Sequence, residues 1–446
     1  YRTLELVMPP LYEFAARRCC EEELAALGRA LERAHVESRS GDWRLSRSSL
    51  VLHELLDKAG NPLFSECYAS LERASTAPAL PGFANPYARA TEESDNMLVW
   101  MFASLSEDDP AEVQRRFGLL YRGTAEYVER YLDELEAAYP GTEVGGRGFS
   151  WNARTGRSYV HAQVARDLVE RIAAGEFADG SYLPSIASLA QSYGASVSTI
   201  QKALGILNAM GVASTSNGRG TKVCTSDVCF DPRALANSSL RRDLQMFADA
   251  LQMLCILLPA ALGTVAGSID DVADDAEREL GRAWSVPKAL MEGFLDNVPL
   301  DPLRDVLREL NNLLLWGYFL VFFGPSGASA PALETLGERG FEALRARDAV
   351  GFAQAMDDYY RCMLPCARFW KLPACRAPSG WPRPLPMLPP WRAHPSSART
   401  RRTAAAPHRR SPARGRSPHT EGKPAGARSR CPRPRWSGPV WRASAR

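Results

Sequence analysis

The stretch "LPSIASLAQSYGASVSTIQKALGILNAMGV", residues 183–212, sets the fold of the centre of the chain. Apolar residues recur at helical spacing on both sides of Gly194, and Ser196 precedes the second apolar run. Glycine ends helices and serine caps their N-termini. We therefore predict a short helix through Tyr193, a tight turn, and a second helix to about Met210. Two helices joined in this way form a helix-turn-helix.

The neighbouring sequence extends this unit on both sides. Upstream, "YVHAQVARDLVERIAA" (159–174) predicts a helix with four apolar residues on one face, Val160, Val164, Leu168 and Ile172. Downstream, "VASTS" and "TKVCT" flank "NGRG", which predicts two strands joined by a turn. Such a hairpin after a helix-turn-helix is called a wing.

Four stretches of this unit, "RIAAGEFADGSYLPS", "LAQSYGAS", "STIQKALGILNAMGV" and "GRGTKV", together resemble the winged helix-turn-helix of GntR-type bacterial regulators over residues 159–224. The resemblance implies binding to double-stranded DNA, with residues 196–209 in a major groove. The DNA-binding residues that we expect from it are Ser185, Ser196, Ser198, Thr199, Gln201, Lys202, Arg219 and Lys222.

The same unit departs from the family at three positions. Ala187, Val197 and Gln201 stand where the family carries arginines. Glutamine can still bond an adenine edge, and Arg219 could enter a minor groove. Losing three arginines nevertheless removes several kcal/mol, at roughly 1–3 kcal/mol for each good contact. The alternative is a unit that serves only packing and dimerisation.

The net charge of +3 is the sum of a strongly basic C-terminal segment and an acidic remainder of the chain. Residues 371–446 hold 18 Lys and Arg side chains, one acid (Glu421) and 15 of the 32 prolines, whereas residues 1–370 hold 36 basic and 50 acidic side chains. We predict a disordered tail. It either grips phosphates without sequence preference or is translated in a shifted reading frame, and we assign it no function. Residues 151–224, by contrast, hold seven basic and four acidic side chains, as a DNA-binding module would.

The remaining sequence contains an imperfect repeat. Residues 62–83 resemble residues 302–323, and residues 106–127 resemble residues 345–363, at offsets of 240 and 239. Helical spacing without β-rich runs predicts an all-α bundle in each copy. Examples of this spacing are Leu119, Tyr121, Tyr127, Val128 and Tyr131.

The bundles resemble the FCD-type ligand-binding domains of the FadR subfamily through "LVLHELLDKAGNPLF" (50–64). The resemblance implies a tandem protein in which the first bundle lacks its own DNA-binding unit. Because the chain starts at Tyr1 without methionine, we predict that it is incomplete at the N-terminus.

These patterns predict a mainly α protein, with two all-α helical bundles flanking a central winged helix-turn-helix domain. The predicted segments are a helical effector-like bundle (1–137), a Gly-rich linker (138–156), the winged helix-turn-helix domain (157–225), a second effector-like bundle (235–370) and the Arg/Pro-rich tail (371–446).

The family's metal site, an aspartate and three histidines, is not matched. Ser49 stands where the aspartate would precede His53, and no histidine lies between His53 and His161. We therefore expect no metal and no cofactor. A small-molecule effector is still expected, and the predicted ligand residues are His53, Asn96, Tyr121 and Arg122. The apolar faces of the bundles equally suit a homodimer.

Other classes of protein find little support. The chain has no glycine-rich phosphate loop and no Gly-x-Ser-x-Gly motif, so we predict no enzyme and no catalytic residues. Ten cysteines without a C-x-x-C pair favour a reduced cytoplasm. The apolar stretch 250–268 contains Pro259 and the stretch 313–323 is too short for a span, which argues against the alternative of a membrane-associated protein.

The resulting hypothesis is a cytoplasmic, dimeric transcriptional regulator, with repression as the mode of action that the family suggests. The alternative is a non-enzymatic dimerisation or scaffold protein whose DNA reading has decayed.

Overall fold

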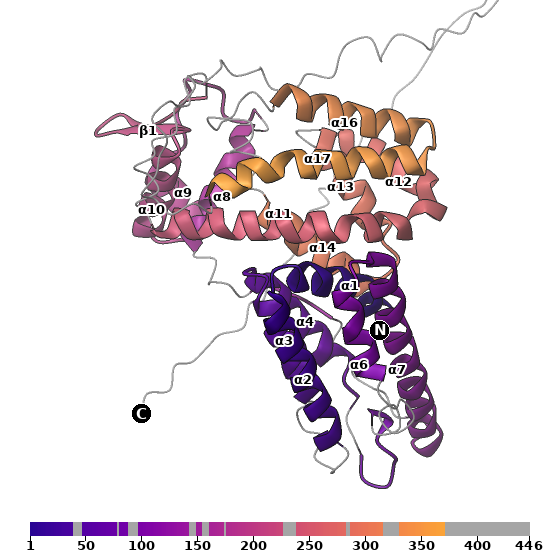
Figure 1. Cartoon of the computed structure of the whole chain (residues 1–446). Coiled ribbons are helices and arrows are strands. Elements are labelled where there is room, and N and C mark those ends of the chain that lie inside the picture. The colour runs from indigo at the N-terminus through magenta and orange to yellow at the C-terminus, as the bar shows by residue number, and fades with distance from the viewer. Residues whose placement is uncertain are drawn as a thin grey trace, which may run out of the picture. The chain divides into compact units, whose positions relative to one another are not determined.

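The computed structural model describes residues 1–38, 47–77, 80–87, 97–141, 149–153, 160–173, 175–225, 238–281, 286–314 and 330–370. In these residues the chain is mainly helical, and its strands form one two-stranded sheet (Figure 1). The predicted fold class, helices around a central winged helix-turn-helix, is confirmed. The tail (371–446) lies outside the described residues, as do residues 142–148 and 154–156 of the predicted linker (138–156).

The first bundle consists of helices whose starts are set by local capping. Asn61 caps one of them by accepting a hydrogen bond from the Leu63 amide at 3.1 Å, and Asp109 caps another through the Ala111 and Glu112 amides at 3.0 and 3.2 Å. A proline follows each cap, where it has no intrahelical bond to lose. The helices are α1 (Arg2–Ala16), α2 (Glu21–Ser38), α3 (Arg47–Asp57), α4 (Pro62–Ser75), α6 (Met97–Ala103), the short η1 (Ser104–Ser106) and α7 (Pro110–Ala138).

Helix α7 shows which part of the predicted apolar spacing forms the core. Tyr121, Val128 and Tyr131 are buried, together with Phe117 one turn earlier. Leu119, the first example of this spacing, is 40% exposed and does not face the core. Two residues along a helix correspond to a rotation of about 200°, which turns Leu119 away from the face of Tyr121.

The second bundle repeats the order of the first. Helices α13, α14 and α17 each begin 239 residues after α3, α4 and α7. Corresponding helices also make corresponding contacts, α1 with α7 as α11 with α17, and α2 with α3 as α12 with α13. The helices are α11 (Ser238–Thr264), η3 (Ala266–Ser268), α12 (Ile269–Leu280), α13 (Val286–Asp296), α14 (Asp301–Leu313), α16 (Ala330–Arg345) and α17 (Ala349–Trp370).

Within the described residues, α11 is the one helix long and apolar enough to cross a membrane. Within its segment Arg241–Thr264, the most apolar window of 18 residues has a mean hydropathy of 1.7, and 72% of that window is buried inside the protein. Figure 1 shows α11 running beside α17, with which it is in contact. Burial in a helical core accounts for this apolar composition without a membrane. Most of the second apolar stretch, residues 315–323, lies outside the described residues.

Residues 160–225, which we call the head, form a hydrophobic core distinct from that of the bundles, to which α11 contributes Leu244. Val164, Leu168 and Ile172 are buried there as predicted, whereas Val160 is 54% exposed, because it starts its helix one turn before the part that packs. The elements are α8 (Val160–Ala173), α9 (Ile186–Tyr193), α10 (Val197–Ala209), β1 (Ala213–Ser216) and β2 (Gly220–Val223).

Candidate nucleic-acid interface

The turn between α9 and α10 is fixed by its own residues. Ser185 caps α9, because its hydroxyl accepts a hydrogen bond from the Ser188 amide at 3.1 Å. Gly194 ends α9 with φ = 58°, a left-handed conformation that glycine adopts without strain. The Ala195 amide then donates to the Ala190 carbonyl at 3.0 Å. The predicted helix-turn-helix is therefore present.

Helix α10 begins at a second serine cap. The Ser196 hydroxyl accepts from the Thr199 amide at 3.2 Å and lies 2.8 Å from the Thr199 hydroxyl. Ser196 and Thr199, both predicted to bind DNA, are thus engaged with each other. Their first contribution is to fix where α10 starts and hence which of its side chains face outward.

The inner face of α10 packs in the head core and the outer face is open. Ile200, Leu204 and Leu207 are at most 3% exposed. The exposed positions are Val197, Ser198, Gln201, Lys202, Gly205 and Asn208. Three of the predicted DNA-binding residues, Ser198, Gln201 and Lys202, therefore lie on one accessible surface.

The wing is tied to this helix. Strands β1 and β2 pair antiparallel, from Ala213 opposite Val223 to Ser216 opposite Gly220, and the Arg219 amide closes the turn on the Ser216 carbonyl at 3.1 Å. The Asn208 amide donates to the Thr215 hydroxyl of β1 at 2.9 Å. The wing is accordingly held against the C-terminal half of α10, with both its predicted DNA-binding residues, Arg219 and Lys222, exposed.

The acidic side chains of the head are occupied by partners of their own. Glu176 pairs with Arg171, whose hydrogen bonds lower the pKa of that carboxyl, and Asp179 accepts from the Thr225 hydroxyl at 3.0 Å. Asp167 accepts from the Tyr193 hydroxyl; burial, together with this hydrogen bond, raises the pKa of Tyr193 to about 12. The fourth acid, Glu170, pairs with Lys288.

Lys202, Arg219 and Lys222 form no ion pair with any of the described residues. These cations are therefore available for phosphates. Lys202 also lies near His161 of α8, where burial and then the lysine charge lower the pKa of the imidazole. His161 is consequently held neutral at lower pH than an ordinary histidine and adds no charge near neutral pH.

Three exposed residues were missed by the sequence reasoning. Val197 and Tyr182 are 51% and 52% exposed, and Gly205 lies on the same open face of α10. Val197 was counted only as a lost arginine. Its position directly after the Ser196 cap could have shown this, because either a valine or an arginine at that position points outward.

The ligand residues predicted in the first bundle do not share one environment. Tyr121 is buried, and its hydroxyl lies 3.2 Å from that of Tyr12, whereas the next residue, Arg122, points outward and pairs with Glu5. His53 is half-buried between helices, and Asn96 lies outside the described residues.

The His53 imidazole is fully engaged. Its Nδ1 lies 2.9 Å from the Ser65 hydroxyl, and its Nε2 lies 3.5 Å from the Glu72 carboxylate. Burial alone raises the pKa of Glu72, but hydrogen bonds from His53 and Ser49 outweigh it and leave that pKa below its ordinary value. His53 also packs on the Tyr68 ring at 4.6 Å between ring centroids.

Tyrosines continue this group into the core. The rings of Tyr68 and Tyr12 lie 6.0 Å apart edge to face, and burial raises the pKa of both Tyr12 and Tyr121 well above the ordinary value. The structure thus connects His53 to Tyr121 through tyrosine side chains that are already bonded to one another.

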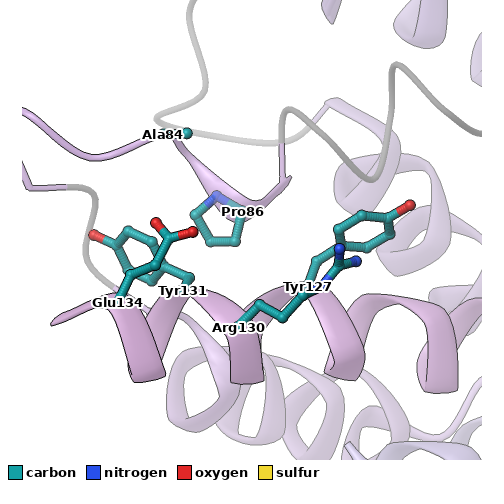
Figure 2. A pocket seen from close by; sticks show the side chains of 6 residues that line it. All are labelled: Ala84, Pro86, Tyr127, Arg130, Tyr131 and Glu134. Atoms are coloured by element: carbon teal, nitrogen blue, oxygen red, sulfur yellow. The ribbon is translucent and has the colours of Figure 1, made fainter. Parts of the chain in front are cut away.

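A hollow in the surface of the first bundle lies elsewhere. Its volume is about 10 Å³, which is room for roughly one water molecule and far below the roughly 300–1,000 Å³ of typical ligand pockets. Figure 2 shows its lining, which includes none of the predicted ligand residues: Ala84, Pro86, Tyr127, Arg130, Tyr131 and Glu134. Within the described part of the chain, no three His, Cys, Asp or Glu side chains are grouped as metal ligands would be.

Of three comparisons with known proteins, one gives a match that is specific to the head. The solved structure of Streptococcus agalactiae GntR aligns with 46% of this chain and 99% of its own at 16% identity, but its TM-score of 0.20 is too low to bear on fold or function. Curated proteins gave no match. Residues 161–223 match the family described as bacterial regulatory proteins, gntR family. The chain therefore carries a GntR-family helix-turn-helix domain in its centre.

Proposed function

We propose that the protein is a transcriptional regulator that binds a specific double-stranded DNA site through the head. In this proposal the outer face of α10 enters a major groove, and Arg219 and Lys222 of the wing contact the backbone or the adjacent minor groove. The observation that carries the proposal is the open face of α10, bounded by cations that pair with no carboxylate among the residues the structure describes. The family match at residues 161–223 supports it.

We further propose that the bundles are effector-sensing and dimerising domains of the FCD type, arranged in tandem. The equal offset of 239 residues between corresponding helices supports the tandem arrangement. A dimer would present two heads to half-sites about one DNA turn apart, and repression would follow where such a site overlaps a promoter.

An effector that uses His53 or Tyr121 has to replace bonds that these residues already make. Its binding would therefore rearrange the tyrosine group, and the thermal unfolding temperature should rise with effector concentration. A panel of small organic acids, tested by thermal shift on the wild type and on Tyr121→Phe, examines this part of the proposal.

The experiment for DNA binding measures salt dependence. The full chain is titrated into labelled DNA from the upstream region of its own gene between 50 and about 300 mM salt. Removing one phosphate contact by Arg219→Ala or Lys202→Ala should lower the slope of log K against log salt by about one. The matched control is Arg130→Ala on α7, which removes the same charge outside the head and should leave the slope unchanged.

The second candidate is a scaffold protein without DNA reading. The observation in its favour is that α10 exposes a single cation, Lys202. It predicts that Arg219→Ala, Lys202→Ala and Arg130→Ala all give the wild-type slope, which would contradict our proposal.

A further inference from the structure

Three uncharged residues follow one another on the open face of α10. Val197, Gln201 and Gly205 are spaced by four residues, so each lies one turn beyond the last on the same side of the helix. The flanking cation, Lys202, lies toward His161 of α8. We call these three residues the neutral stripe and ask what it contacts when α10 lies against DNA.

Val197 gives the stripe an apolar end. It is 51% exposed in the first turn of α10, where the Ser196 cap directs it away from the core. A β-branched residue is not favoured in a helix for its own sake. In a major groove an apolar side chain has one complementary group, the C5-methyl of thymine.

Gln201 gives the stripe a hydrogen-bonding centre. Its amide can bond the N6 and N7 atoms of adenine in a bidentate manner. Four residues of helix rise by about 6 Å, which is less than two base-pair steps of about 3.4 Å. Val197 and Gln201 can therefore reach neighbouring base pairs at the same time.

Packing within the head does not require a glycine at position 205. A Cβ placed on it would meet no atom within 4 Å, although glycine in a helix costs about 1 kcal/mol relative to alanine. A glycine in such a place allows a close approach by another surface. Because Gly205 lies one turn beyond Gln201, the surface that approaches it is the DNA when the neutral stripe faces a groove.

The stripe also lacks the usual reader of guanine. Arginine is the commonest side chain on the guanine edge, and α10 contains none. We propose that α10 selects an A·T-containing core, with Val197 on a thymine methyl and Gln201 on an adenine of a neighbouring pair. This inference rests on the proposed function and names the partner that the same surface selects.

The experiment begins with duplexes selected by the full chain from a randomised pool, and the best duplex is then used as the probe. We expect A·T pairs at the core of the enriched site. Replacing the contacted thymine by uracil removes one methyl group and should weaken wild-type binding about three- to fivefold. Val197→Ala should weaken it by a similar factor, and uracil should then have no further effect.

Matched variants separate these contacts from general effects. Gln201→Ala should weaken binding at least about fivefold and relax the preference for adenine at one position, whereas Gln163→Ala on α8 should do neither. Val197→Arg should shift the selected site toward guanine, whereas Val160→Arg, an equally exposed valine at the start of α8, should not. Gly205→Ala should raise the unfolding temperature and weaken DNA binding together.

The possible failures are distinguishable. A selected core rich in G·C pairs, or equal binding of thymine and uracil duplexes by the wild type, overturns the A·T assignment while the protein remains a DNA-binding regulator. Enrichment of no sequence at all overturns the proposed function and this inference with it.

Discussion

The head and the first bundle use their polar side chains in opposite ways. In the head, Gln201 and Lys202 are exposed and have no partner among the described residues. In the first bundle, His53 and Tyr121 are bonded to Glu72 and Tyr12. A side chain can serve a partner only when it is not already satisfied, or when binding replaces what satisfies it. The difference supports the proposal that the interface with a partner lies on the head, and it favours a structural role for the bundle's polar group.

The largest expected effect concerns the inner face of α10. Leu207 is 0% exposed in the head core, so Leu207→Ala should reduce the free energy of unfolding of the head by about 2–5 kcal/mol and abolish DNA binding. Leu132→Ala, at a 48% exposed position of α7, is the matched control. Chemical denaturation of both variants measures the difference, and equal losses would contradict the separate core of the head.

The next effect concerns the bundle interior. Tyr121→Phe removes a hydroxyl that lies 3.2 Å from the buried Tyr12 hydroxyl, and should cost about 1–2 kcal/mol of stability. Tyr139→Phe, at a 53% exposed tyrosine of the same bundle, should stay within about 0.5 kcal/mol of the wild type. A neutral Tyr121→Phe would show that the tyrosine group is not structural.

A smaller effect is expected at the start of α10. Ser196→Ala removes the acceptor of the Thr199 amide and should cost about 1 kcal/mol. Ser198→Ala, two residues away on the exposed face, removes the same hydroxyl without a cap and should change stability by less than about 0.5 kcal/mol. If both variants unfold alike, the cap does not set the start of the helix.

The smallest effect is a pH dependence in the bundle. Because the pKa of Glu72 is depressed below its ordinary value of 4.5, its carboxylate stabilises the fold above that pH, and this contribution is lost as the pH falls through the lower, folded-state value. Between pH 6 and about pH 3 the wild type should therefore lose more thermal stability than Glu72→Gln. When His53 is already replaced by asparagine, Glu72→Gln should change the pH dependence of stability less than it does in the wild type. An equal change in the two backgrounds would show that Glu72 and His53 are not coupled.

The head could be predicted from the sequence because its helix caps and its turn are set by neighbouring residues. Ser185, Gly194 and Ser196 act on neighbouring amides, so the helix-turn-helix and the wing could be predicted together with the exposed candidates on α10. The exposed Val160 was misplaced because helical spacing does not tell where packing begins along a helix.

The partners of the ligand residues predicted in the first bundle lie on other helices and could not be predicted from the local sequence. Tyr121 is satisfied by Tyr12 and Arg122 by Glu5, across more than a hundred residues of sequence in each case. No local pattern specifies such pairs, since they depend on how α1 packs against α7. For the same reason the sequence could not predict that His53 is occupied by Glu72.

We propose above that the head reads DNA sequence through the almost uncharged outer face of α10. Fluorescence anisotropy of the full chain, at about 0.15 M salt, compares DNA from the upstream region of its own gene with a shuffled duplex of equal composition. We expect the native duplex to be bound about a thousandfold more tightly than the shuffled one, or better. Equal, weak binding to the two duplexes would contradict it.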